Sequence, residues 1–90
     1  MLTSPERKAL KAKAHKLDPV VQIGSKGVTD EVIAEIDRAL KAHELIKVRA
    51  GSLDRDQRDQ ALVSILEKTK AQPVQQVGKV FVLFRKKNDE

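Results

Sequence analysis

The sequence contains no cysteine, tryptophan or tyrosine among its 90 residues. Without thiolates the chain can build no disulfide, zinc ribbon or iron–sulfur cluster, and it has no thiolate nucleophile. The aromatic residues are Phe81 and Phe84, which lie in the most hydrophobic segment, so we expect them to pack in the core. Stacking of nucleic-acid bases on aromatic side chains is therefore not expected.

Long apolar runs are also missing. No segment approaches the ~18 apolar residues that a membrane helix needs, and residues 1–17 lack the continuous apolar stretch of a secretory signal. We therefore expect a cytoplasmic protein with no membrane partner. The length predicts a single domain over residues 1–90, with a core spanning about 2–86 and a short charged tail at 87–90.

Groups that could carry catalysis are few. His15 and His43 fall near the ends of two different predicted helices and show no metal-ligand spacing. Asp54, Asp56 and Asp59 cluster at the start of a predicted helix, where capping, the helix dipole and solvation account for them. We expect no catalytic residue, metal site, cofactor or small-molecule substrate, and hence no enzyme.

Positive charge is present in excess, and it is unevenly distributed. The formal net charge is +5 and the pI is about 9.7. Residues 1–17 hold five basic side chains against one acid, whereas residues 18–84 hold ten of each sign. The excess lies at the chain ends, and it favours a polyanionic partner.

Hydrophobic periodicity and capping signals predict seven elements. Thr3, Ser4 and Pro5 start a helix over residues 5–16, and Asp18-Pro19 ends it. The remaining elements are a short strand at 20–23, a helix from Thr29 to about His43, a strand from Leu45 to Ala50, a helix from the Asp54/Gln57 capping box to near Lys70, and strands at 74–77 and 80–84.

This order predicts an α/β fold, of the two-layer α+β kind. Strand–helix–strand units imply parallel crossovers, and Gly78-Lys79 suits a type II′ hairpin between the last two strands, so the four-stranded sheet should be mixed. The final strand is apolar on both faces and should lie inside the sheet.

A glycine-flanked loop, residues 24–27, joins the first strand to the second helix. Gly24 and Gly27 would let a ligand approach the backbone, where amides and a helix dipole favour an anion, and Lys26 adds a positive charge. The spacing fits neither a nucleotide-binding P-loop nor a dinucleotide fingerprint. The alternative is that the two glycines only form a tight turn.

Two further groups of cations could extend this surface. Arg7, Lys11, His15 and Lys8 form a predicted basic helix face opposite Leu10, Ala14 and Leu17, or merely a solvated face. Lys47 and Arg49 share one face of a strand, where they could reach RNA, cover a half-open sheet or pair with carboxylates.

Three segments occur together in a distinctive order. IGSKGVT begins at Ile23, HELIKVR spans residues 43–49, and QVGKVFVLFR spans residues 76–85. Over about residues 2–85 the chain resembles the CRM domain, named for chloroplast RNA splicing and ribosome maturation, and in particular its stand-alone bacterial YhbY form.

The resemblance implies a fold similar to the C-terminal domain of a bacterial translation initiation factor. It also implies RNA binding and association with precursors of the large ribosomal subunit. The GxxG loop and the basic first helix are the expected contacts. The candidate RNA-binding residues are therefore Gly24, Ser25, Lys26, Gly27, Thr29, Arg7, Lys8, Lys11, Lys13, Lys47 and Arg49.

With no stacking platform, we expect a monomer that recognises phosphate, 2′-hydroxyl groups and RNA shape with low to moderate sequence specificity. We expect the loop and the first helix to hold the same RNA. Two other hypotheses stay open: a protein-interaction module using the acidic stretch at residues 54–59, and a DNA-binding protein, which the lack of a recognition-helix pattern disfavours.

Overall fold

The computed structural model describes residues 2–86 and has the expected order of elements. These are α1 (Ser4–Ala14), β1 (Val21–Gln22), α2 (Asp30–His43), β2 (Leu45–Arg49), α3 (Arg55–Thr69), β3 (Gln72–Val77) and β4 (Val80–Phe84). The predicted α/β class is confirmed. The predicted charged tail at 87–90 lies outside the described residues.

The helices begin where the capping signals predicted. Thr3 and Glu6 form a reciprocal capping box at α1, and Asp54 and Gln57 form another at α3. The end of α1 was predicted wrongly, because the helix stops at Ala14 and not at residue 16. Leu17, predicted on the buried stripe, is 37% exposed, since its amide bonds to the Ala14 carbonyl in a turn that leads the chain away from the core.

The sheet has the strand order β1-β2-β4-β3 and is mixed, as expected. β1 and β2 are parallel, and β4 runs antiparallel to both of its neighbours, β2 and β3. The interior position of β4 is confirmed. Gly78 has a φ of 56° at the hairpin turn, where a positive value suits glycine. β1 is shorter than predicted, although the amides of Val20 and Ile23 still bond to β2 carbonyls.

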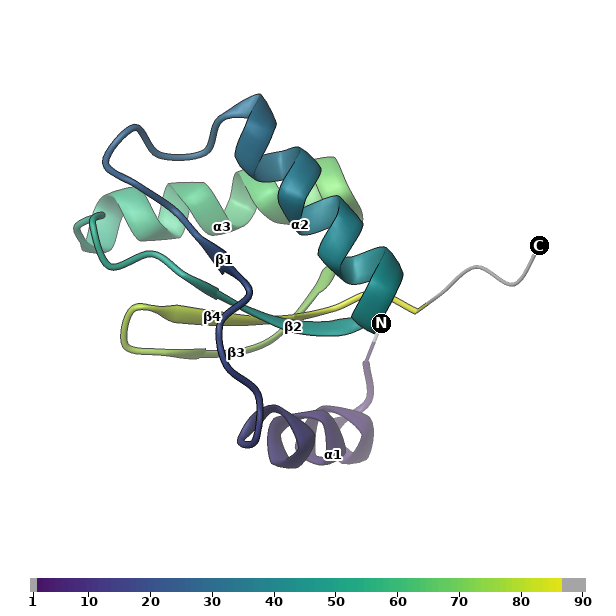
Figure 1. The fold of residues 1–90 in the computed structure, drawn as a ribbon. Coiled ribbons are helices and arrows are strands. Elements are labelled where there is room, and N and C mark those ends of the chain that lie inside the picture. The colour runs from purple at the N-terminus through teal and green to yellow at the C-terminus, as the bar shows by residue number, and fades with distance from the viewer. Residues whose placement is uncertain (1, 87–90) are drawn as a thin grey trace.

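The helices cover both faces of the sheet, which corrects the expected two layers to three (Figure 1). α2 and α3 pack on one face over the main core, which includes Ile36, Ile65 and Phe81. α1 packs on the other face over a smaller cluster that includes Ala14 and Val82. The sequence showed that each helix has an apolar stripe, but not which face of the sheet each stripe would cover.

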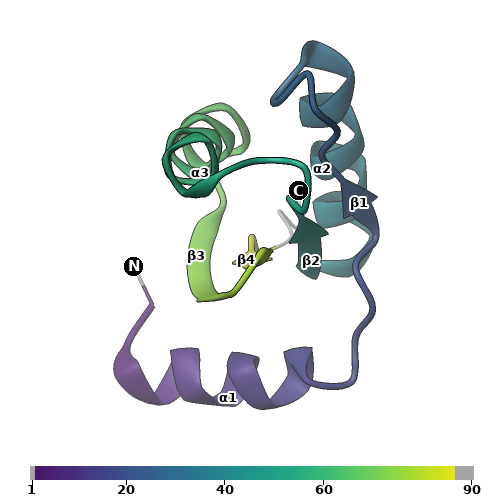
Figure 2. The same cartoon turned by 90° about the vertical axis from the view of Figure 1, so that its left-hand side faces the viewer.

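Three connections lie at one edge of the sheet, the edge formed by the C-terminal ends of β1, β2 and β3. The loop 24–27 follows β1, residues 50–54 follow β2, and the 78–79 turn follows β3, and Figure 1 shows all three at the left. The Ala50 amide donates to the Lys79 carbonyl at 2.7 Å, which ties the second connection to the hairpin turn. Figure 2 views the molecule from this edge, with α1 below the sheet and the β1–α2 loop above it.

Candidate nucleic-acid interface

The loop of residues 24–27, called here the GxxG loop, is exposed at this edge of the sheet. The Gly27 amide donates to the Gly24 carbonyl at 3.0 Å, closing a turn, and Gly27 has a φ of 78°, which favours glycine. A Cβ atom added at either glycine would meet no atom within 4 Å beyond the glycine and its two neighbours in the chain. Gly24, Ser25 and Lys26 are exposed and Gly27 is half-buried. The backbone here is open to a ligand.

Thr29 has a structural role beside the loop. Its Oγ1 accepts a hydrogen bond from the Val32 amide at 3.2 Å and so caps α2. The hydroxyl can still donate one hydrogen bond of its own. Thr29 therefore fixes the start of α2 next to the GxxG loop, and any contact with a ligand would be additional to that role.

The two sides of the GxxG loop differ chemically. On the α2 side, the loop borders a hollow that is also lined by the carboxylates Asp30 and Glu31. On the α3 side, a hollow of about 240 Å³ is lined by the loop together with Leu53, Gln57, Gln60 and Ser64, and no carboxylate lines it. The lining of the first hollow is therefore acidic beside the N-terminal amides of α2, whereas Lys26 is the charged residue that lines the second.

Sequence reasoning missed the α3 residues of the second hollow. Gln57, Gln60 and Ser64 are three and then four residues apart, so a helix places them on one face. That spacing could have revealed a polar stripe. Its position beside the GxxG loop, however, depends on how α3 crosses the sheet, which no local pattern encodes.

The cations of α1 lie on the opposite face of the sheet from the α2 and α3 layer, so the structure does not bring them together with Lys26 (Figures 1 and 2). Lys8 and Lys13 are exposed, whereas Arg7 and Lys11 are half-buried. Within the described part of the chain, the buried Nε of Arg7 has no hydrogen-bond partner.

The basic face of α1 was also predicted in the wrong orientation. Successive helix residues are rotated by about 100°, so Arg7 and Ala14, seven positions apart, lie nearly above one another. Ala14 is buried against the sheet. Arg7 and Lys11 therefore flank the packed side of α1 and do not stand opposite it.

Lys47 joins the α1 cations and not the GxxG loop. In β2, Ile46 and Val48 pack in the main core with α2 and α3, so Lys47 and Arg49 alternate onto the α1 face. Lys47 lines a hollow of about 510 Å³ together with Lys11 and His15. Arg49 is exposed at the end of β2. The candidate residues thus form two groups on different faces.

Comparison with known proteins identifies the family. Residues 2–85 match the CRS1/YhbY (CRM) domain. The chain belongs to the CRM domain family. A Haemophilus influenzae protein named "RNA-binding protein" is 43% identical over 84 residues, which cover 93% of this chain and 85% of that relative. Bacillus subtilis YqeI, named a probable RNA-binding protein, is 34% identical over 89 residues, covering 99% of this chain and 93% of YqeI.

A solved structure shows the same CRM fold. The solution structure of the hypothetical protein SAV1595 from Staphylococcus aureus superposes with a TM-score of 0.84 and 32% sequence identity. The match covers 99% of this chain and 93% of SAV1595. The confirmed resemblance therefore extends from the three sequence segments to the whole arrangement of helices and strands.

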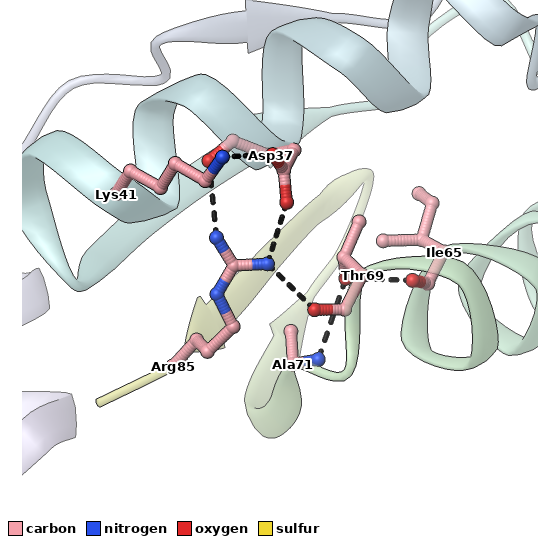
Figure 3. A network of polar contacts seen from close by, with 6 residues as sticks. All are labelled: Asp37, Lys41, Ile65, Thr69, Ala71 and Arg85. Atoms are coloured by element: carbon pink, nitrogen blue, oxygen red, sulfur yellow. Dashed lines mark hydrogen bonds and ion pairs between the residues drawn. The ribbon is translucent and has the colours of Figure 1, made fainter. Parts of the chain in front are cut away.

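One cation of the CRM segments has a structural role. Arg85 follows β4, and its Nη1 donates to Asp37 Oδ1 and to the Thr69 carbonyl, both at 2.7 Å, while Nη2 donates to the Asp37 carbonyl at 3.1 Å (Figure 3). Thr69 is the last residue of α3, where carbonyls lack helical partners. Arg85 therefore fastens the end of β4 to α2 and α3.

The Arg85 contacts change the acidity of Asp37. The hydrogen bond from Arg85 holds the pKa of Asp37 below its ordinary value, partial burial opposes this effect, and Lys41 at 3.2 Å reinforces it. The folded chain therefore favours the ionised form of the Asp37 carboxyl group.

None of the helices within residues 2–86 is both long enough and apolar enough to cross a membrane. In the same residues, no group of three or more histidine, aspartate or glutamate side chains is arranged to hold a metal ion.

Proposed function

We propose that this CRM-domain chain binds ribosomal RNA and acts as an assembly factor of the large ribosomal subunit. The observation that carries the proposal is the GxxG loop, whose glycines have open space above them and whose Lys26 is exposed. The family supports it, and so do relatives that are named RNA-binding proteins. The chain would work as a cytoplasmic monomer, without catalysis or a cofactor.

The loop would hold the RNA backbone. Absence of side chains at Gly24 and Gly27 lets a phosphate come close to main-chain amides, and Lys26 adds one charge contact. Such contacts depend on the phosphate and not on the base, so they position RNA without reading its sequence.

The second cation group would contact a different part of the same RNA. Lys11 and Lys47 line one hollow on the α1 face, with Lys8 and Lys13 exposed on the same helix. Because the sheet separates this group from the GxxG loop, a short straight strand of RNA is poorly suited to reach both. Folded RNA, which can present two segments, suits this arrangement better, and ribosomal precursors are folded RNA.

Binding to ribosomal precursor RNA across a range of salt concentrations tests the proposal. Each phosphate contact should make the slope of log K against log salt concentration more negative by about 0.7 to 0.9. The double variant Lys11→Ala/Lys47→Ala and the single variant Lys26→Ala should each reduce that slope. Affinity that does not change with salt, or equal competition by duplex DNA, would contradict the proposal.

The ribosomal role needs a test in cells. RNA crosslinked to the native protein should map to large-subunit precursors, and the protein should sediment with them after mild lysis. Crosslinks dominated by messenger RNA, or retention of a protein partner after nuclease treatment with no RNA, would refute the assembly role.

A further inference from the structure

The polar hollow on the α3 side of the GxxG loop has features of a binding site that backbone contact alone does not require. Its volume is about 240 Å³, below the roughly 300–1,000 Å³ of pockets that enclose drug-sized ligands. The hollow therefore suits one small chemical group of a ligand and not an extended ligand.

The base of this hollow is apolar and its walls are polar. Leu53 and Ala61 are buried, and Ala61 leaves room because it is small. Gln57 and Gln60 line the hollow beside them, on the same face of α3 as Ser64. An apolar base with a few hydrogen-bonding groups is the usual composition of a small-ligand site.

The polar side chains in the hollow are able to form hydrogen bonds with a ligand. Gln57 Oε1 accepts from the Asp54 amide at 3.0 Å, which fixes its side chain and leaves its amide nitrogen to donate. In the chain from residue 2 to 86, the side chains of Gln60 and Ser64 make no hydrogen bond. Both can donate and accept, which matches the edges of a base and a ribose hydroxyl.

We propose that this hollow holds one unpaired nucleotide of the bound RNA, with its phosphate toward Lys26 and the loop, and its base or ribose against Gln60 and Ser64. The inference rests on the proposed RNA binding. The lining of this hollow includes Lys26 and no carboxylate, whereas Asp30 and Glu31 line the hollow on the other side of the loop. For the base to enter the hollow the nucleotide must be unpaired, because paired bases stay stacked inside a helix.

Two RNAs that share one double helix made from two strands test the subsite. One duplex is blunt-ended and the other carries a short single-stranded extension. The wild-type chain should bind the extended RNA more tightly than the blunt one at the same salt concentration. Gln60→Ala should lose about fivefold of that preference, as expected for one lost hydrogen bond, because it removes a base or ribose contact and leaves the phosphate contacts in place.

The control is Gln76→Ala, which makes the same chemical change at an exposed position of β3 outside the hollow. It should keep the full preference. Lys26→Ala should weaken binding of both RNAs, and of the extended RNA at least as much, since the phosphate of its unpaired nucleotide lies toward Lys26. Loss of helix content in Gln60→Ala is not expected because alanine favours helices, and circular dichroism checks it.

The outcomes separate the two proposals. If Gln60→Ala changes neither RNA, or weakens both equally, the nucleotide subsite is wrong while RNA binding stands. If the wild-type chain binds neither RNA in a salt-dependent way, the proposed function itself fails.

Discussion

Two cations from the segments that typify this family differ completely in their surroundings. The Arg85 side chain is 21% exposed and makes three hydrogen bonds to α2 and α3. Lys26 is exposed, and within residues 2–86 it takes part in no salt bridge. A basic residue in a family segment is therefore not by itself a nucleic-acid contact. Its partners in the fold decide whether its charge is available.

The largest effect should come from removing the structural cation. Arg85→Ala leaves Asp37 without its main partner and the Thr69 carbonyl without a donor. We expect a loss of about 2–3 kcal/mol in the free energy of unfolding, measured by urea denaturation, because hydrogen bonds to charged groups are among the strongest. The RNA affinity of the folded fraction should change less than about twofold, because the Arg85 side chain contacts α2 and α3 and not the GxxG loop.

Lys86→Ala is the matched control, since Lys86 is the next residue and is exposed. It should leave stability nearly unchanged. A loss in Arg85→Ala no larger than in Lys86→Ala would show that the contacts in Figure 3 contribute little. Arg85→Lys should be intermediate, because lysine keeps the charge without the planar fork of donors.

The converse result is expected at Lys26. Lys26→Ala should weaken binding to ribosomal precursor RNA by about three- to tenfold and reduce the salt slope by about 1, as for one lost phosphate contact. Its stability should stay within about 0.5 kcal/mol of the wild type. Lys68→Ala, at the exposed far end of α3, is the control. Equal losses from the two variants would deny the loop a special role.

Most of the fold could be predicted because its signals are local. Thr3 before Pro5 and the Asp54/Gln57 capping box indicated helix starts through signals within three residues, and the structure adds a Thr3/Glu6 box at the first of them. The apolar sequence of β4 predicted its interior position, which the strand order confirms. The end of α1 was less predictable, since proline at residue 19 sets only an outer limit and the core decides where the helix stops.

The grouping of the candidate site was less predictable, for a physical reason. Sequence identified the individual cations, but Lys26 and Lys11 were expected on one surface and lie on different faces of the sheet. Which face a helix covers depends on packing between distant segments, such as those of Ala14 and Val82, which belong to the same smaller core cluster. The local sequence pattern therefore does not predict which face a helix covers. For the same reason it does not predict that Gln60 lies beside the GxxG loop.

A smaller change tests whether the glycine itself matters. Gly24→Ala adds one methyl group into open space at a position without positive φ, so the fold should tolerate it. If a phosphate approaches this backbone closely, the methyl group should weaken RNA binding by about threefold, a fraction of one lost contact. Gly51→Ala is the control in the next connection, where the added atom would make an ordinary contact 3.5 Å from Arg49 Nε. Unchanged binding in Gly24→Ala would mean that RNA does not approach the loop at this residue.

The smallest effect should be the pH dependence of the Arg85 contacts. The pKa of Asp37 is lowered in the folded chain, so its stabilisation is fully present above the ordinary aspartate value of about 4 and is lost as pH falls through the lowered folded value. The Asp37 side chain is 36% exposed, so solvent screens the interaction and the pH-dependent part should stay below about 1 kcal/mol.

The variant Asp37→Asn tests this, because its side chain cannot ionise. The difference in unfolding free energy between wild type and Asp37→Asn should therefore be constant from pH 5 to 7 and shrink below about pH 4, whereas other carboxylates such as Glu6 contribute equally to both proteins and cancel. A difference that stays constant down to pH 2 would show that ionised Asp37 does not stabilise the fold, and that Arg85 is held by the carbonyl groups alone.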